Sequence, residues 1–150
     1  MIAIDTNVLL RYLLADDASQ YTKAKALIKG KTPVLITDVV LVETVWTLTG
    51  KRYQLDKGAI CDVLRGLIGD GAFRFESSQV FWSALMDYRD SKPMRGKVLD
   101  FADALIVHKA RSVASEDGQE LEGFYSFDKA VEQLQGSKAQ DLNNLVNQNS

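Results

Sequence analysis

The opening stretch of the chain constrains the fold more than any other. An apolar run from Ile2 to Ile4 ends at Asp5, and from Val8 onward apolar residues recur three and four positions apart, as on one face of a helix. An acid at a strand-to-helix junction of a parallel sheet faces the crevice where open α/β sheets bind ligands. The same carboxylate could equally cap the following helix, so this stretch alone leaves both interpretations open.

Short strand patterns and longer helical patterns alternate along the rest of the chain. Apolar periodicity predicts further helices at residues 21–28, 39–48, 56–68 and 78–88, from 99 onward, and after 128. Strands are expected at residues 34–36, 73–76 and 123–127, and the pattern permits a short closing strand near residues 141–142. The segment 89–97 carries four positive charges, a proline and a glycine, which is typical of a loop.

Length and composition predict one domain of an ordinary intracellular protein. The chain has 150 residues and is 46% hydrophobic, enough for one substantial core. We therefore expect a single domain over residues 1–150, with a polar tail at about 137–150. The apolar runs are far shorter than the ~20 residues of a membrane span, and no leader pattern is visible, so a cytoplasmic location and no membrane association are expected. A single cysteine, Cys61, excludes an internal disulfide.

Four acids stand where strands end or on the inward faces of predicted helices: Asp5, Glu43, Asp103 and Asp128. Glu43 lies in an apolar helical run. Asp103 falls on the apolar stripe expected for its helix, which passes through Leu99, Ala102, Ile106, Ala110 and Val113. Asp100 is displaced from Asp103 by only about 60° around a helix axis, so both carboxylates can serve one site. Asp100 could be a ligand, an outer-shell acceptor or only a helix cap.

Carboxylates gathered in one pocket repel each other unless cations occupy it. Hard oxygen ligands without nitrogen or sulfur favour Mg²⁺ or Mn²⁺, and His108 is the only histidine, so acid–base cleavage of RNA by a histidine pair is excluded. The matching chemistry is phosphodiester hydrolysis by a metal-activated water. The net charge of −2 provides no general basic surface, so any nucleic acid must be bound by local cations or metal ions.

Four blocks of the sequence together resemble the signature blocks of the PIN domain. They are MIAIDTNVLL at residues 1–10, VETVW at 42–46, DFADALI at 100–106 and SFDK at 126–129. More narrowly, the chain is similar to the VapC-type toxins of bacterial toxin–antitoxin pairs. The resemblance extends to about residue 136. It implies an α/β protein with a three-layer α/β/α fold around a short central parallel sheet, and a Mg²⁺- or Mn²⁺-dependent endoribonuclease.

The resemblance also implies roles for individual residues. Asp5, Glu43 and Asp103 match the metal-binding acids of the family, and Asp128 matches its more variable fourth acid. Thr6 and Ser126 match small hydroxyl residues that line the same pocket. A haloacid-dehalogenase-type phosphatase also begins with a strand that ends in Asp, but it needs a second Asp where this chain has Asn7.

Several partners are expected. The basic residues beside the acid-bearing helix, Arg89, Lys92, Arg95 and Lys97, and also Arg11, are candidates for contacts with the RNA backbone. The resemblance implies a cognate antitoxin, and a surface formed by Trp46, Leu48, Tyr53 and Leu55 is the candidate for binding it or for a homodimer. A catalytically silent PIN-like binding module, regulated by a protein partner, is the alternative to a nuclease.

Overall fold

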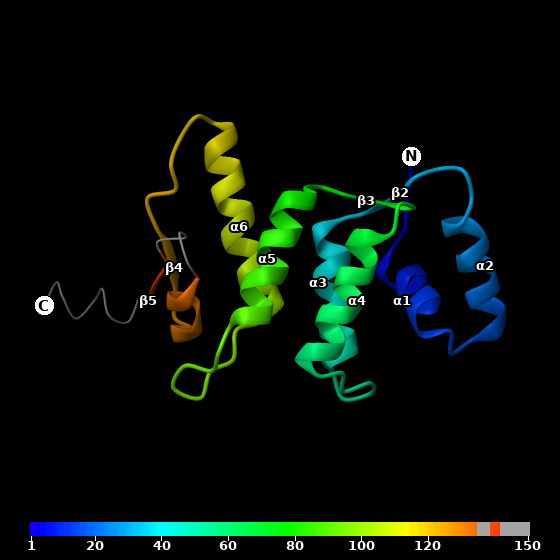
Figure 1. The fold of residues 1–150 in the computed structure, drawn as a ribbon, viewed down its shortest axis with the longest axis horizontal. Coiled ribbons are helices and arrows are strands. Elements are labelled where there is room, and N and C mark those ends of the chain that lie inside the picture. Colours follow the sequence, from blue (N-terminus) through cyan, green and yellow to red (C-terminus); the bar gives the residue numbers. More distant parts are fainter. Residues whose placement is uncertain (135–138, 142–150) are drawn as a thin grey trace, which may run out of the picture. The chain divides into compact units, whose positions relative to one another are not determined.

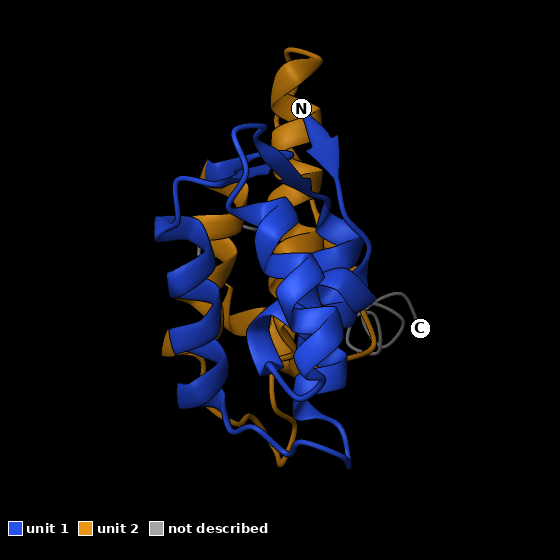
Figure 2. Cartoon of the chain, turned by 90° about the vertical axis from the view of Figure 1, so that its right-hand side faces the viewer, with its two compact units in different colours: residues 1–78 blue, residues 79–150 orange. Residues whose placement is uncertain are grey.

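A computed structural model describes residues 1–134 and 139–141 of the protein. The chain divides into two compact units, residues 1–78 and residues 79–150 (Figure 2), and each unit is described separately. Within the described residues, none of the helices has the length and hydropathy that a membrane span requires.

The first unit is built on a short parallel sheet (Figure 1). Its strands, in spatial order, are β1 (Ile2–Ala3), β2 (Val34–Ile36) and β3 (Phe73–Phe75), and both pairings are parallel. The register places Val34 opposite Ile2 on one side and Phe73 on the other. Because the strands are parallel, each connection contains helices. These are α1 (Thr6–Leu14), α2 (Ala18–Ile28), α3 (Asp38–Thr49) and α4 (Lys57–Gly69).

Every helix of the first unit begins with a side-chain cap. The acceptors are Asp5 for α1, Asp17 for α2, Thr37 for α3 and Asp56 for α4, and each satisfies an N–H group that has no partner within its helix. The expected α3 and α4 are confirmed to within one residue. The second helix starts at Ala18 rather than at residue 21, because the Asp17 cap allows three polar and small residues to join it.

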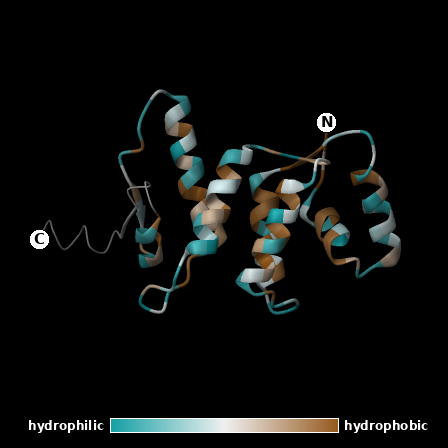
Figure 3. Cartoon of the chain, viewed as in Figure 1, coloured by the Kyte–Doolittle hydropathy of each residue, from teal (hydrophilic) through white to brown (hydrophobic). Residues whose placement is uncertain are grey.

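The core of the first unit lies where the helices meet the sheet. Its large, fully buried side chains come from α1, α2, β2, α3 and α4: Leu9, Ile28, Val34, Ile36, Leu41, Leu48, Ile60 and Leu64. Figure 3 shows hydrophobic residues running along α3 in particular. The burial of Leu48, which is 1% exposed, corrects the expected partner surface, because a side chain in the core cannot dock a partner.

The second unit contains two long helices, α5 (Ser78–Asp90) and α6 (Phe101–Glu116), followed by β4 (Phe124–Ser126), a 3₁₀ helix η1 (Lys129–Gln133) and β5 (Ala139–Asp141). The ring of Phe101 lies edge-on to Phe81 and Tyr88 of α5, at 6.1 and 5.9 Å between centroids, a favoured aromatic geometry. β4 pairs with β5 in parallel as a separate two-stranded sheet. The expected closing strand is thus confirmed as far as Asp141; residue 142 and most of the expected tail lie outside the described residues.

Two expectations about the second unit need correction. The buried side chains of α6 are Phe101, Ala102, Ala104, Leu105 and Val107. The expected stripe is therefore confirmed at Ala102 and at Leu99, which is buried just before the helix, but it is wrong at Ile106 and Val113, which are 52% and 48% exposed. Apolar residues lie on more than one side of α6, and only one side packs. The helix expected after residue 128 is the short 3₁₀ helix η1, which still buries Val131 as its pattern predicted.

The short parallel sheet and its helices confirm the expected α/β class with a three-layer α/β/α architecture.

Candidate active site

Asp5 lies at the junction between β1 and α1. It is the residue before the first turn of α1, with an extended backbone, and its Oδ1 accepts a hydrogen bond from the backbone N–H of Val8 at 3.0 Å. The side chain remains exposed. The cap is therefore confirmed, and the exposed carboxylate stays accessible to a ligand.

Asp5 and Glu43 line one cleft in the first unit. The cleft has a volume of about 450 Å³ and is lined by Asp5, Thr6, Asn7, Leu10, Arg11, Val40, Glu43, Thr47, Arg52 and Tyr53. Glu43 comes from the middle of α3 and is exposed, and its neighbours Val39 and Trp46 are themselves 64% and 54% exposed. Two segments far apart in the sequence thus contribute two carboxylates and a hydroxyl, that of Thr6, to one hollow.

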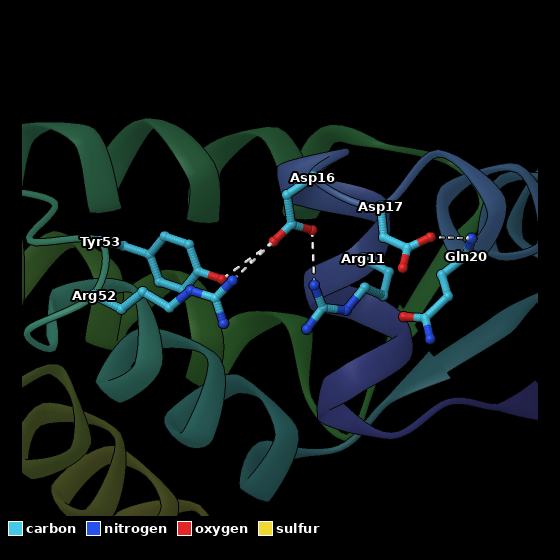
Figure 4. A network of polar contacts seen from close by, with 6 residues as sticks. All are labelled: Arg11, Asp16, Asp17, Gln20, Arg52 and Tyr53. Carbon is cyan, nitrogen blue, oxygen red and sulfur yellow. Dashed lines mark hydrogen bonds and ion pairs between the residues drawn. The ribbon is translucent and has the colours of Figure 1, made fainter.

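The cationic side of this cleft was only partly predicted. Arg11 donates through Nη1 to Oδ1 of Asp16 at 2.8 Å, and Tyr53 donates its hydroxyl to Oδ2 of Asp16 at 3.3 Å (Figure 4). Arg52 completes the network with an ion pair of 3.7 Å to Oδ2 of Asp16. Arg11 was a candidate from the sequence. Arg52 was not, because its place beside Asp16 depends on how the α3–α4 loop meets the end of α1.

Asp100 and Asp103 form a capping box at the start of α6 in the second unit. The side chain of Asp100 accepts from the backbone N–H of Ala102 at 3.3 Å, and Oδ2 of Asp103 accepts from the backbone N–H of Asp100 at 3.3 Å. Such reciprocal bonds satisfy donors that the helix cannot satisfy itself. A carboxylate has about four acceptor sites on its two oxygens, so a capping bond is compatible with binding a ligand as well.

Asp128 follows β4 and belongs to the same electrostatic neighbourhood. Its Oδ1 accepts from the backbone N–H of Ala130 at 2.9 Å, while its own N–H donates to Oγ of Ser126 at 2.9 Å. Burial raises the pKa of Asp103, and the negative charges of Asp100 and Asp128 raise it further against the opposing backbone hydrogen bond. Asp103 therefore lies close enough to Asp100 and to Asp128 for their negative charges to repel its own.

The basic segment before α6 is folded into a tight turn. Met94 and Lys97 exchange backbone hydrogen bonds of 2.8 and 2.9 Å, and the two residues between them have φ of 52° (Arg95) and 77° (Gly96). Two left-handed residues in sequence are typical of a type I′ hairpin turn. Lys92, Arg95 and Lys97 are exposed, whereas Arg89 is paired with Asp90 through two bonds of 2.8 and 3.2 Å.

Comparison with protein families shows a match to the PIN domain over residues 2–134. The chain belongs to the PIN domain family. No curated protein matches it closely. The match contains the junction that bears Asp5, the helix that bears Glu43, the capping box and the β4–η1 corner that bears Asp128.

Membership of the PIN family establishes a nuclease-type fold for this chain. PIN domains are in general nucleases, which are hydrolases, and RNA is the substrate that the family suggests. The short parallel sheet of the first unit and the helix-rich architecture agree with that fold.

The donor chemistry of this PIN domain suits a hard cation. Among the described residues, no three His, Cys, Asp or Glu side chains lie together so that they could hold a metal ion. However, the raised pKa of Asp103 has repulsion from Asp100 and Asp128 among its causes, and a divalent cation relieves such repulsion. Carboxylate oxygens without thiolate or imidazole select Mg²⁺ or Mn²⁺.

One polar pair of the second unit was missed by sequence reasoning. Nε2 of His108 on α6 lies 2.6 Å from Oδ2 of Asp87 on α5, and the two side chains are 12% and 28% exposed. The residues are 21 positions apart and belong to different helices, so no local pattern could have paired them. The bond joins α5 to α6 and explains the single histidine as a packing residue.

Proposed function

We propose that this PIN domain is a metal-dependent endoribonuclease in which Asp5, Glu43 and Asp103, with Asp128, hold a Mg²⁺ or Mn²⁺ ion. The observation that carries the proposal is that carboxylates gather locally in each unit. Asp5 and Glu43 share one cleft, and burial together with the negative charges of Asp100 and Asp128 raises the pKa of Asp103. Negative charges that lie near each other repel, and a divalent cation held by carboxylate oxygens would relieve that repulsion.

A divalent ion in this set would supply Lewis acidity for phosphodiester hydrolysis. Hydrogen bonds within the chain fix the carboxylates that would hold this ion. The backbone N–H of Val8 bonds the Asp5 carboxylate, and the backbone N–H of Asp100 bonds that of Asp103. Thr6 lines the cleft beside Asp5, and Ser126 holds the backbone N–H of Asp128. Asp100, which caps α6, is assigned as a supporting acid rather than as a first ligand.

Binding of the negatively charged RNA backbone beside these acids requires positively charged side chains nearby. Arg11 borders the Asp5–Glu43 cleft, and the turn that carries Lys92, Arg95 and Lys97 lies directly before the capping box in the chain. Contacts from such residues to phosphate are independent of base sequence. They therefore supply affinity for RNA in general and leave the choice of RNA to other features.

The nature of the cut ends tests this proposal. Purified protein is incubated with total RNA and Mg²⁺ or Mn²⁺, with and without EDTA, and the ends of the products are mapped. Hydrolysis by water leaves 5′-phosphate and 3′-hydroxyl ends, whereas attack by the ribose 2′-hydroxyl leaves cyclic phosphates. Cleavage that persists in EDTA and yields cyclic phosphates would overturn the proposal.

We further propose that the protein is the toxin of a type II toxin–antitoxin pair. The support is an apolar surface around an acid: Val39 and Trp46 lie one turn on either side of Glu43 on α3, and both are more than half exposed. A helix or extended segment can cover such a surface while a basic side chain pairs with Glu43. Of the surface expected from sequence, only Leu48 is excluded by its burial; Trp46 stays in it, and Val39 is added to form this Val39–Trp46 surface.

Co-purification distinguishes an antitoxin from a second copy of the chain. The isolated protein is sized in solution, and then co-expressed with the product of a neighbouring small gene. An antitoxin should bind the Val39–Trp46 surface and restore growth to cells that express the toxin. A homodimer would instead bury that surface without a second protein. Normal growth on expression of the protein alone would argue against the toxin role.

A further inference from the structure

The carboxylate of Asp16 connects three side chains that line the candidate cleft. Both of its oxygens are used: Oδ1 by Arg11 at 2.8 Å, and Oδ2 by Tyr53 at 3.3 Å and Arg52 at 3.7 Å (Figure 4). Arg11, Arg52 and Tyr53 all border the cleft of Asp5 and Glu43, whereas Asp16 itself is not among its lining residues. The acid therefore contacts the two arginines from outside the cleft lining.

The backbone turn at the end of α1 places Asp16 in this position. α1 ends at Leu14, and Ala15 adopts a left-handed conformation with φ of 50°, its N–H bonded to the carbonyl oxygen of Arg11 at 3.1 Å. A left-handed residue is usual after a helix, but glycine is the residue that adopts it without cost. The turn at Ala15 brings the next side chain back to Arg11, one turn earlier in the helix.

Arg52 is held at two points although most of it is in solvent. Its side chain is 72% exposed, which normally leaves an arginine free to move. Here the guanidinium carbon lies 5.2 Å from the centroid of the Tyr53 ring, a cation–π distance, and Nη2 reaches Asp16. Since the Tyr53 hydroxyl also bonds Asp16, the ring and the carboxylate together orient Arg52.

Arg11 lies where two hollows of the first unit meet. Besides the larger cleft, it borders a second hollow of about 330 Å³ along α1 and α2, which also contains Lys23 and Gln20. Asp5, Asn7 and Arg11 are common to both hollows. An extended RNA strand that passes Asp5 would thus pass Arg11 whether it continues into the larger cleft or into the second hollow.

We propose that Arg11 and Arg52 form a paired guanidinium site for a backbone phosphate of single-stranded RNA, and that Asp16 is the positioning residue of this pair. The inference rests on the proposed function, since it assumes that the cleft receives RNA. Guanidinium groups bind phosphate oxygens in a fixed fork geometry, so pre-orientation reduces the entropy lost on binding. Within the described contacts, Arg11 donates to Asp16 through Nη1, and its remaining N–H groups are available to a phosphate.

The direction in which RNA affinity changes when the negative charge of Asp16 is removed tests the proposal. Removing a negative charge near an RNA site should strengthen binding if only long-range electrostatics matter. Removing Asp16 should instead weaken binding, because both arginines lose their anchor. The matched control is Asp17→Asn, which removes the same charge from the adjacent residue and keeps an acceptor for the α2 cap at the N–H of Gln20.

Binding is measured by fluorescence anisotropy with a labelled single-stranded poly-uridine RNA in EDTA. The reference protein is Asp5→Asn, which lowers the repulsion in the cleft. In this background Asp16→Asn should lower the affinity roughly fivefold or more, and Asp17→Asn should leave it equal or higher. Arg52→Gln should also weaken binding and reduce the salt slope by about 0.7. In an Arg11→Gln/Arg52→Gln background, Asp16→Asn should have no further effect.

Several results would overturn the proposal. Asp16→Asn and Asp17→Asn could change the affinity for RNA equally, Arg52→Gln could leave that affinity unchanged, or the reference protein could show no measurable RNA binding. Full displacement of the RNA by inorganic phosphate at constant ionic strength would assign the pair to a free anion instead. Arg52 is exposed, so its variant remains informative if Asp16→Asn fails to fold. Cleavage by the wild-type protein is measured in a separate assay. A nuclease that lacks this phosphate site would cleave RNA but fail the binding test. A phosphate site without nuclease activity would pass the binding test and cleave nothing.

Discussion

Oδ2 of Asp103 accepts a hydrogen bond of 3.3 Å from the backbone N–H of Asp100, the residue whose own side chain caps the same helix. The two acids were candidates for a metal site, and they are also the capping box of α6. These roles are compatible because a carboxylate has two oxygens with about four lone pairs. The cap fixes the orientation of Asp103, and burial and neighbouring acids make its charge costly.

Replacing Asp103 by Asn should stabilise the protein at neutral pH in the absence of metal. The folded-state pKa of Asp103 lies above its unfolded value, so the native state binds the proton more tightly. The free energy of unfolding then falls as the pH rises from the unfolded pKa through the raised folded pKa, and the penalty persists above it. Asp103→Asn removes that penalty, so its advantage in thermal midpoint should be largest at pH values above the raised folded-state pKa and should shrink in acid.

Asp103→Ala serves as the control for the pH experiment. Alanine also removes the charge, but it leaves the N–H of Asp100 without its acceptor, which costs about 1 kcal/mol. Asp103→Ala should therefore be less stable than Asp103→Asn at every pH. Identical melting curves for the two variants would show that the capping bond contributes nothing.

Mg²⁺ should stabilise the wild-type protein and fail to stabilise the ligand variants. A ligand that binds only the native state at a hundredfold excess over its Kd adds about 2.7 kcal/mol to the free energy of unfolding. For a protein of this length that corresponds to a rise of roughly 5–10 °C. Calorimetry with increasing Mg²⁺ should show this rise for the wild type and a much smaller one for Asp5→Asn and Asp103→Asn. Equal shifts in all three proteins would place the ion elsewhere.

Asp5 should tolerate Asn but not Ala as far as folding is concerned. Asn retains an oxygen for the N–H of Val8, whereas Ala removes the cap of α1 at a cost of about 1 kcal/mol. Urea denaturation should thus give similar midpoints for the wild type and Asp5→Asn and a lower midpoint for Asp5→Ala. If Asp5→Asn were as unstable as Asp5→Ala, it could not be used to test catalysis.

Neutralising the basic turn should weaken RNA binding without regard to sequence. In the Lys92→Ala/Lys97→Ala variant the turn itself is kept, because its hydrogen bonds are made by backbone atoms and its left-handed residues are Arg95 and Gly96. For each phosphate that a lysine no longer neutralises, the salt slope should fall by about 0.7. Lys31→Ala, which removes an exposed lysine of the first unit, is the control. Unchanged affinity of the double variant for every RNA tried would leave the turn without a binding role.

The elements that sequence reasoning located best are those whose signals are local. Asp5 ends an apolar run, and it caps the following helix as one of its two interpretations expected. The failures have non-local causes. α6 carries apolar residues on two faces, and only the packing of Phe101 against Phe81 and Tyr88 selects the buried one.

The sequence predicted the acidic residues of the candidate site but did not predict Arg52 among its basic residues. An acid at a strand end is visible in the sequence because its position follows from the pattern around it. Arg52 lies in the loop between α3 and α4, and its role depends on contacts with Asp16 and the Tyr53 ring. Leu48 was misassigned because α3 is apolar on more than one side, and packing decides that Leu48 is buried while Trp46 stays exposed.

The rate of RNA cleavage in Mg²⁺ by the wild type, Asp5→Asn and Asp103→Asn tests the central claim most directly. The two variants alter acids from different units, and both keep the acceptor that caps their helix. The proposed metal site predicts that the wild type cleaves RNA and that each variant, folded as shown by its melting curve, loses at least about a hundredfold in rate, equivalent to ~2.7 kcal/mol of activation free energy. Wild-type rates in either folded variant would contradict the assignment of these carboxylates to catalysis.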